Sequence, residues 1–243
     1  MKRTERHRLK ENELSHVLSE ASARLAENRA RYGSVFLVVV LVALGAGGYW
    51  AWKTRAETRA QVMLTEALAV MQSPVEDPKP VNGKPTQTPG SYPTINARAE
   101  ASLAKFSAVY NGYPSTRAGI AARYYAASAL AMLGRAAEAV TRYQEVVDRA
   151  GTRDFYGRMA QLGKVEAQLQ AKQFDQAISS AQALANNTAD QSLPRDAVLM
   201  ELGRVYAAAG KATEARQTFN KVVADFPESP YADEAKQLLT TVT

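Results

Sequence analysis

A run of 19 uncharged residues, Ser34 to Trp52, constrains this chain of 243 residues more than any other feature. As a helix with a rise of ~1.5 Å per residue, the run reaches about 28 Å, close to the ~30 Å hydrocarbon core of a bilayer. Tyr32 precedes it and three aromatic residues lie near its end, where amphipathic rings favour the membrane interface. The sequence therefore predicts one transmembrane helix over 34–53.

A cleaved signal peptide is the alternative interpretation of this run. Val35 to Leu44 has the length of a signal-peptide core, and Gly45 to Gly48 supply small residues for a cleavage site. Against it, 33 residues precede the run and apolar residues continue beyond the glycines. A lipid anchor would need a cysteine, which the sequence lacks.

The distribution of basic residues predicts the orientation of the span. Three Lys or Arg lie close to each end, and the N-terminal tail, residues 1–33, adds Lys2, Arg3, Arg6, Arg8 and Lys10. Short loops rich in Lys and Arg stay in the cytoplasm, so we expect a cytoplasmic N-terminus and a large C-terminal part across the membrane. Apolar residues at helical spacing from Leu14 to Leu25 also predict a short amphipathic helix in the tail, either bound to the membrane or a partner or simply solvated.

Small residues on the span form a candidate surface for another membrane helix. Ala43 and Gly47 are four residues apart, with Gly45 and Gly48 beside them. Such residues let two helices approach closely in a membrane. The alternative is that they have no such role, because small residues are common in spans.

Beyond residue 95 the sequence repeats with a period of 38 residues, marked by Ala139, Ala177 and Ala215. A period of this length is typical of helical solenoids. The last unit has seven residues at the spacing of the tetratricopeptide motif: Leu202, Gly203, Tyr206, Gly210, Ala215, Phe219 and Pro227. The predicted fold class is all-α, with a single N-terminal transmembrane helix followed by a tetratricopeptide repeat solenoid.

The other units match the motif less closely. In the middle unit we align Gly163 with Gly203, which requires a turn between its two helices two residues longer than in the last unit. Phe106 and Pro114 have the eight-residue spacing found at the end of the last unit. We therefore expect residues 96–112 to be the second helix of a first repeat.

The first helix of that repeat is predicted to be residues 54–72, which continue the helical spacing of the span. Residues 73–95 lie between the two helices, and 73–93 contain six of the ten prolines and little to bury, which predicts a loop. Residues 96–243 then form the remaining repeats and a C-terminal capping helix.

Charge and composition argue against nucleic-acid binding and catalysis. Residues 1–59 hold 11 of the 30 Lys and Arg and 6 of the 24 Asp and Glu, so residues 60–243 are almost neutral, with 19 against 18. His7 and His16 precede the span, and there is no cysteine, so the repeats lack the usual metal ligands and a thiol nucleophile. We predict no enzyme activity, no cofactor and no small-molecule substrate.

The first helices of the repeats are the candidate protein-binding surface. By repeat position, the groove residues are Tyr124, Ser128, Met132, Lys164, Gln168, Met200 and Arg204. The lining is mixed apolar and polar, without the Lys and Asn pattern of repeats that clamp a C-terminal carboxylate. The alternative is that these are ordinary surface residues.

The segments KENELSHVLSEASARLAENRARYG before the span and GYWAWKTRAETRA after it, together with the degenerate repeats, resemble the YfgM family. Members are bacterial inner-membrane proteins described as ancillary subunits of the SecYEG translocon. The resemblance implies a cytoplasmic tail, a periplasmic repeat domain, and protein partners among the translocon, periplasmic chaperones and secreted clients.

Two other functions remain open. A holdase-like chaperone would bind unfolded clients directly in the groove. The protein could also be a factor for envelope assembly or cell division. Periplasmic repeat proteins of outer-membrane assembly and of the Tol system contain turns that resemble Tyr113-Pro114-Ser115 and Phe226-Pro227-Glu228-Ser229.

Overall fold

The computed structural model describes residues 29–81, 84–187 and 193–242. The chain divides into two compact units, residues 1–55 and 56–243. The amphipathic helix predicted in the N-terminal tail and both histidines lie outside the described residues.

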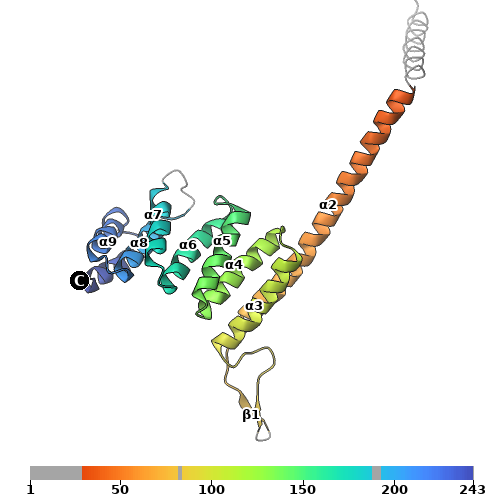
Figure 1. Ribbon diagram of the computed structural model, residues 1–243. Coiled ribbons are helices and arrows are strands. Elements are labelled where there is room, and N and C mark those ends of the chain that lie inside the picture. Colours follow the sequence, from red (N-terminus) through yellow and green to blue (C-terminus); the bar gives the residue numbers. More distant parts are fainter. Residues whose placement is uncertain (1–28, 82–83, 188–192, 243) are drawn as a thin grey trace, which may run out of the picture. The chain divides into compact units, whose positions relative to one another are not determined.

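The first described element is the 43-residue helix α2 (Arg29–Met71), which contains the whole uncharged run (Figure 1). Ser34–Met71 is long and apolar enough to cross a membrane, and an 18-residue window within it has a mean hydropathy of 2.0. The large apolar side chains of this stretch are exposed, among them Phe36 at 70% and Leu44 at 68%. By length and composition this stretch fits a membrane span, and a signal sequence near the N-terminus meets the same criterion.

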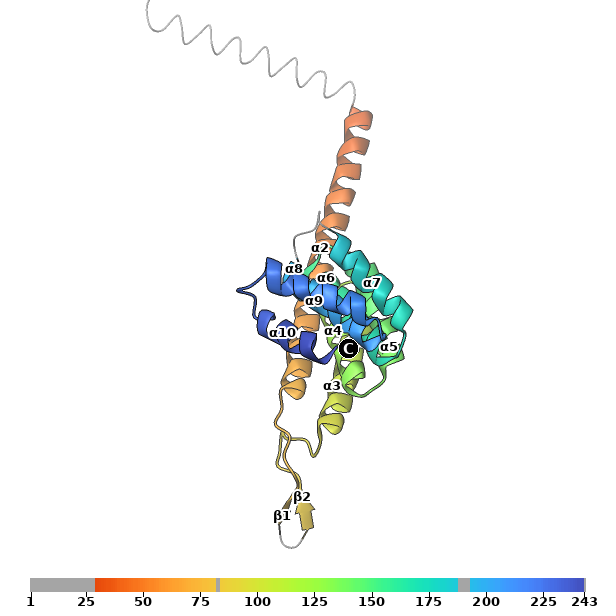
Figure 2. The same cartoon turned by 90° about the vertical axis from the view of Figure 1, so that its left-hand side faces the viewer.

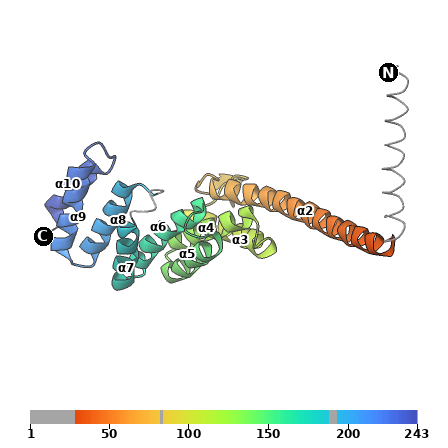
Figure 3. The ribbon, with the colours of Figure 1, turned by 90° about the horizontal axis from the view of Figure 1, so that it is seen from above.

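Eight further helices follow α2 in the described part of the chain, and each packs against the next (Figure 3). They are α3 (Ile95–Gly112), α4 (Arg117–Met132), α5 (Ala136–Ala150), α6 (Phe155–Gln170), α7 (Phe174–Asn186), α8 (Arg195–Ala208), α9 (Ala212–Asp225) and α10 (Ala232–Thr241). Besides neighbours in sequence, α4 contacts α6 and α6 contacts α8. The first helices of successive repeats therefore lie next to one another.

The three complete repeats are the helix pairs α4–α5, α6–α7 and α8–α9, and the turns inside them have the same backbone conformation. Gly134, Lys172 and Gly210 are 38 residues apart, and all three adopt a left-handed conformation, with φ of 72°, 58° and 73°. Each follows its helix by the same number of residues. The longer turn expected in the middle repeat is therefore wrong, because Lys172 takes the left-handed conformation that glycine usually provides.

Two glycines allow neighbouring helices to approach closely. A Cβ atom on Gly203 of α8 would lie 2.4 Å from the ring of Phe219 in α9. A Cβ atom on Gly163 of α6 would lie 2.6 Å from the ring of Tyr143 in α5. In both cases the ring occupies the volume that a larger residue would need.

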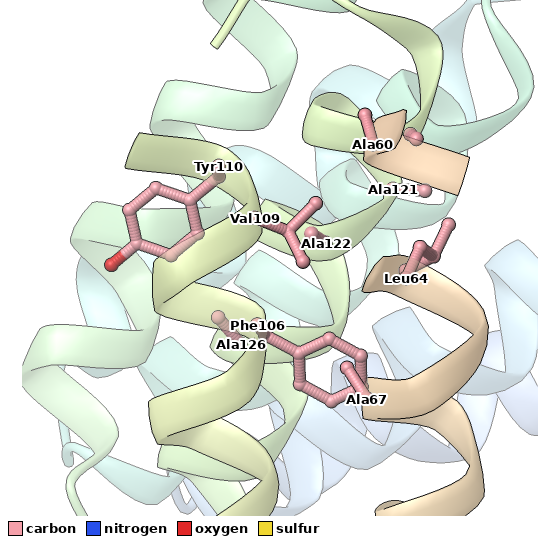
Figure 4. Close-up of a cluster of buried hydrophobic side chains, with 10 residues drawn as sticks. Ala60, Leu64, Ala67, Phe106, Val109, Tyr110, Ala121, Ala122 and Ala126 are labelled. Atoms are coloured by element: carbon pink, nitrogen blue, oxygen red, sulfur yellow. The ribbon is translucent and has the colours of Figure 1, made fainter. Parts of the chain in front are cut away.

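The core at the start of the array combines α2, α3 and α4 (Figure 4). Its buried residues include Ala60, Leu64 and Ala67 from α2, Phe106, Val109 and Tyr110 from α3, and Ala121, Ala122 and Ala126 from α4. Alanines leave space at the helix crossings, and the Phe106 side chain fills part of it. The two segments predicted to form the first repeat thus share one core.

Glu57 of α2 connects this first helix to the start of α4. The backbone N–H groups of Arg117 and Ala118 donate to its two carboxylate oxygens, at 3.0 and 3.1 Å. These N–H groups belong to the first turn of α4, where no helical acceptor is available. A carboxylate at this end also interacts favourably with the helix dipole.

The proline-rich segment contains a short hairpin in place of an irregular loop. Strands β1 (Lys79–Val81) and β2 (Lys84–Thr86) pair antiparallel, and Pro80 lies opposite Pro85 (Figure 2). Prolines lack an N–H, so this pair suits a position that exchanges no backbone hydrogen bond. Six prolines hid the hairpin from sequence reasoning, because proline is rare in strands.

Replacing Lys172 with glycine should stabilise the array. A non-glycine residue in the left-handed region costs about 1–2 kcal/mol, part of which the greater freedom of an unfolded glycine offsets. We expect Lys172→Gly to raise the free energy of unfolding by about 0.5–1 kcal/mol. Denaturant titration of the detergent-solubilised full-length protein, followed by circular dichroism, measures this. Lys172→Ala is the control, because it keeps the strained backbone and should give no gain; a loss of stability in Lys172→Gly would contradict the argument.

Candidate functional site

The first helices of the three complete repeats enclose one side of a groove of about 250 Å³. We call it the α4–α6–α8 groove. Its lining comprises Tyr124 and Ser128 from α4, Tyr143 from α5, Met159, Leu162, Gly163 and Glu166 from α6, Ala197, Glu201 and Arg204 from α8, and Tyr231 before α10. Apolar, aromatic and charged groups therefore face the same space.

The 38-residue period explains which side chains face the groove. Tyr124 and Leu162 are one period apart, as are Ser128, Glu166 and Arg204. Equivalent turns keep α4, α6 and α8 in register, so residues one period apart point to the same side of the stack. The groove is therefore built from corresponding positions of consecutive repeats.

Three of the seven predicted groove residues line it: Tyr124, Ser128 and Arg204. In α6 the prediction is wrong, because Leu162 and Glu166 line the groove and the predicted Lys164 and Gln168 do not. Aligning Gly163 with Gly203 put Lys164 at the position of Arg204, whereas the 38-residue period puts Glu166 there.

Lys164 and Gln168 have other surroundings. The Nζ of Lys164 donates to Oε1 of Gln144 in α5 at 2.8 Å, and its side chain lines a separate cavity between α6 and α7. Burial lowers the pKa of Lys164 below its ordinary value. Gln168 is 6% exposed, so neither residue offers its side chain to a ligand in the groove.

The two predicted methionines also lie outside the lining. Met200 is one period from Tyr124 and Leu162, but it is only 1% exposed and packs in the cluster that α8, α9 and α10 share. The capping helix belongs to that cluster, which explains why this position is closed in the last repeat alone. Met132, the last residue of α4, is 45% exposed and does not line the groove.

Tyrosine rings form the α4 side of the groove. The ring centroid of Tyr124 lies 5.8 Å from that of Tyr143 and 5.7 Å from that of Tyr156. Burial raises the pKa of Tyr124, and more strongly that of Tyr143, above the ordinary tyrosine value. Both therefore stay neutral at physiological pH and offer ring faces and hydroxyl groups.

Charged groups form the α8 side. The Arg204 guanidinium contacts Glu234 of α10 at 2.6 Å but Glu201 only at 3.5 Å. The Glu201 side chain is 17% exposed, and its burial raises the pKa of that carboxyl. Glu201 is therefore a largely buried carboxylate with a weak partner, an arrangement that is often found at functional sites.

Glu166 supplies the second carboxylate of the lining. It is exposed on α6, and within the described part of the chain it forms no ion pair. Its charge contributes to raising the pKa of Glu201. Sequence reasoning missed both residues, although the 38-residue period applied from Ser128 and Arg204 leads to Glu166.

The small residues predicted to pack membrane helices lie on the exposed part of α2. A Cβ atom on Gly45, Gly47 or Gly48 would meet no atom within 4 Å, and Ala43 is exposed as well. Their role against another membrane helix stays a prediction. Across residues 29–81, 84–187 and 193–242, no three His, Cys, Asp or Glu side chains are grouped to hold a metal ion.

Comparison with known proteins agrees with this architecture. The tetratricopeptide repeat model matches residues 121–151 and 197–229. These ranges cover most of α4 and α5, and α8 with α9. The fold class predicted from the sequence is confirmed: the chain is an all-α tetratricopeptide-like repeat protein with a long apolar N-terminal helix.

Solved structures show the same fold. The nearly identical TPR-like repeats assigned to a kinesin light chain of Podosopora anserina superpose with a TM-score of 0.55 and 18% identity, covering 76% of this chain and 86% of theirs. A single-substitution variant of those repeats superposes with a TM-score of 0.56 and 18% identity, covering 76% of this chain and 85% of that chain. No curated protein matches the sequence. Nothing in these comparisons points to the YfgM family in particular.

The raised pKa of Glu201 predicts a pH-dependent effect of Glu201→Gln. The pKa of the Glu201 carboxyl in the folded protein is raised above its ordinary value of 4.5. Such a carboxyl contributes to the stability of the folded state at a pH below 4.5, and this contribution is lost as the pH rises through the folded-state pKa. The glutamine variant has no such loss. Its stability relative to the wild type should therefore increase from pH 4 to pH 7.

Thermal unfolding of both proteins across this pH range measures the difference. Glu100→Gln removes an exposed carboxylate of α3 outside the groove and serves as the control. A difference between Glu201→Gln and the wild type that shrinks as the pH rises would contradict the prediction.

Proposed function

We propose that this protein is a membrane-anchored scaffold that binds a segment of a protein partner in the α4–α6–α8 groove. The observation that carries the proposal is the groove itself, where tyrosine rings and weakly paired carboxylates from consecutive repeats face one space. Tetratricopeptide-like repeat proteins are generally scaffolds for protein–protein interaction and are usually not enzymes.

The dimensions of the groove favour an elongated occupant. Packed helices lie about 8–10 Å apart, so three neighbouring helices span about 16–20 Å. Roughly six residues of extended chain, at ~3.3 Å each, cover that length. A short protein segment can therefore contact all three repeats at once.

The apolar helix supports a membrane anchor. Its length and exposed apolar side chains suit a bilayer, and the basic tail supports a cytoplasmic N-terminus. Together with the resemblance to the YfgM family, these features support our proposal that the repeats lie in the periplasm, anchored in a bacterial inner membrane. The proposed partners are then the SecYEG translocon, periplasmic chaperones and secreted clients.

Site-specific crosslinking tests whether the groove binds a partner. A photoreactive benzoylphenylalanine at Leu162 should give crosslinked protein adducts in native membranes, because this side chain lines the groove. The same group at Gln217, exposed on α9 outside the groove, is the matched control. Equal adduct patterns at the two positions would exclude the groove as the binding surface.

Co-purification in mild detergent identifies the partners and separates the proposed function from its alternatives. We expect translocon subunits with the full-length protein, and fewer of them when the span is replaced by an unrelated one. Recovery of envelope-assembly or division proteins would favour an assembly factor. A broad set of unrelated unfolded proteins would favour a holdase-like chaperone.

A further inference from the structure

The α4–α6–α8 groove has an excess of negative charge. Glu166 and Glu201 line it from adjacent helices, and Arg204 is the one cationic side chain among its lining residues. The guanidinium of Arg204 makes its shorter contact with Glu234, at 2.6 Å, and only a 3.5 Å contact with Glu201. The positive charge is thus largely satisfied within the protein, whereas Glu201 has only the 3.5 Å contact and Glu166 forms no ion pair among the residues that the structure describes.

Aromatic rings complement these carboxylates. Tyr124, Tyr143 and Tyr231 line the same space from α4, α5 and the segment before α10. The face of an aromatic ring attracts a cation, and a carboxylate nearby adds a charged hydrogen-bond acceptor. The apolar side chains of Met159 and Leu162 lie in the same lining and suit an apolar neighbour of that cation.

We propose that the groove selects a protein segment that carries a lysine or arginine next to an apolar side chain. This inference rests on the proposed function and specifies the chemistry of its partner. The basic group lies between Glu166 and Glu201, and the apolar side chain lies against the rings and Leu162. An incoming cation offsets the repulsion between the two carboxylates, so binding favours both of their ionised forms.

The same charges disfavour other segments. An acidic or phosphorylated segment would meet two carboxylates and an arginine already bound to Glu234. The Glu166 and Glu201 carboxylates also repel a free C-terminal carboxylate, because solvent ions screen charges only weakly in a partly buried site. The groove therefore discriminates by charge as well as by shape.

Peptide selection on the full-length protein tests this chemistry. The protein is held in nanodiscs of neutral phosphatidylcholine, so that basic peptides are not retained by anionic lipid, and empty nanodiscs remove background binders. A random peptide library is then selected on the wild type and on the variants Glu166→Gln and Glu201→Gln. We expect the wild type to enrich peptides in which Lys or Arg neighbours an apolar residue.

The variants determine whether the carboxylates cause that preference. An enriched peptide, labelled and titrated by fluorescence anisotropy, should bind about tenfold more weakly to each variant, the effect of one lost charge-assisted contact. Glu166 is exposed, so Glu166→Gln leaves the fold intact even if Glu201→Gln disturbs packing. Glu100→Gln on α3 is the matched control and should bind like the wild type.

The outcomes separate the two levels of the proposal. Enriched peptides without Lys or Arg, or basic peptides whose affinity is unchanged in both variants, overturn the charge selectivity while leaving peptide binding intact. In that case Leu162→Asp, which alters the groove without removing its carboxylates, still weakens binding. If no peptide is enriched above empty nanodiscs, both the selectivity and the proposed function fail.

Discussion

The array depends on contact between each helix and the one that follows it, because no single pair of helices here can bury its own apolar surface. At two helix–helix contacts a glycine faces a ring, since Gly163 faces Tyr143 and Gly203 faces Phe219. A side chain larger than glycine would displace the ring and separate the helices. These two glycines therefore set how closely α6 packs against α5 and α8 packs against α9.

A stack of this kind leaves an apolar surface at each end, and this chain covers the two ends differently. At the start, α2 provides Ala60, Leu64 and Ala67 to the core of the first repeat. At the other end, α10 joins α8 and α9 in one cluster and encloses Met200. The last repeat thereby loses the groove position that Tyr124 and Leu162 occupy in the repeats before it, so the cap limits how far a bound segment can extend.

Sequence periodicity predicted the fold well because packing imposes it: Ala139, Ala177 and Ala215 are all fully buried. It predicted the site less well. Gly163 and Gly203 both lie at a helix crossing, but they are 40 residues apart and not one period of 38, so aligning them shifted the α6 residues by two. Lys172 gave no signal of the turn, since lysine rarely adopts a left-handed backbone. The burial of Met200 depends on the capping helix, which a repeat motif does not describe, and the hairpin at Pro80 and Pro85 depends on a pairing that proline content conceals.

The acidity of the groove is local, because residues 60–243 as a whole carry almost no net charge. Glu201 is disfavoured in its ionised form by burial, and Arg204, the nearest cation, is shared with Glu234. A site designed for stability alone would pair Glu201 closely or replace it with an uncharged side chain. Glu201 lowers stability at neutral pH and lies near tyrosine rings and Glu166, which forms no ion pair within the described ranges. This arrangement is instead preorganised for a cation from outside the chain. The ionised Glu201 carboxylate thus destabilises the protein when the groove is empty, and binding of a basic segment offsets that destabilisation.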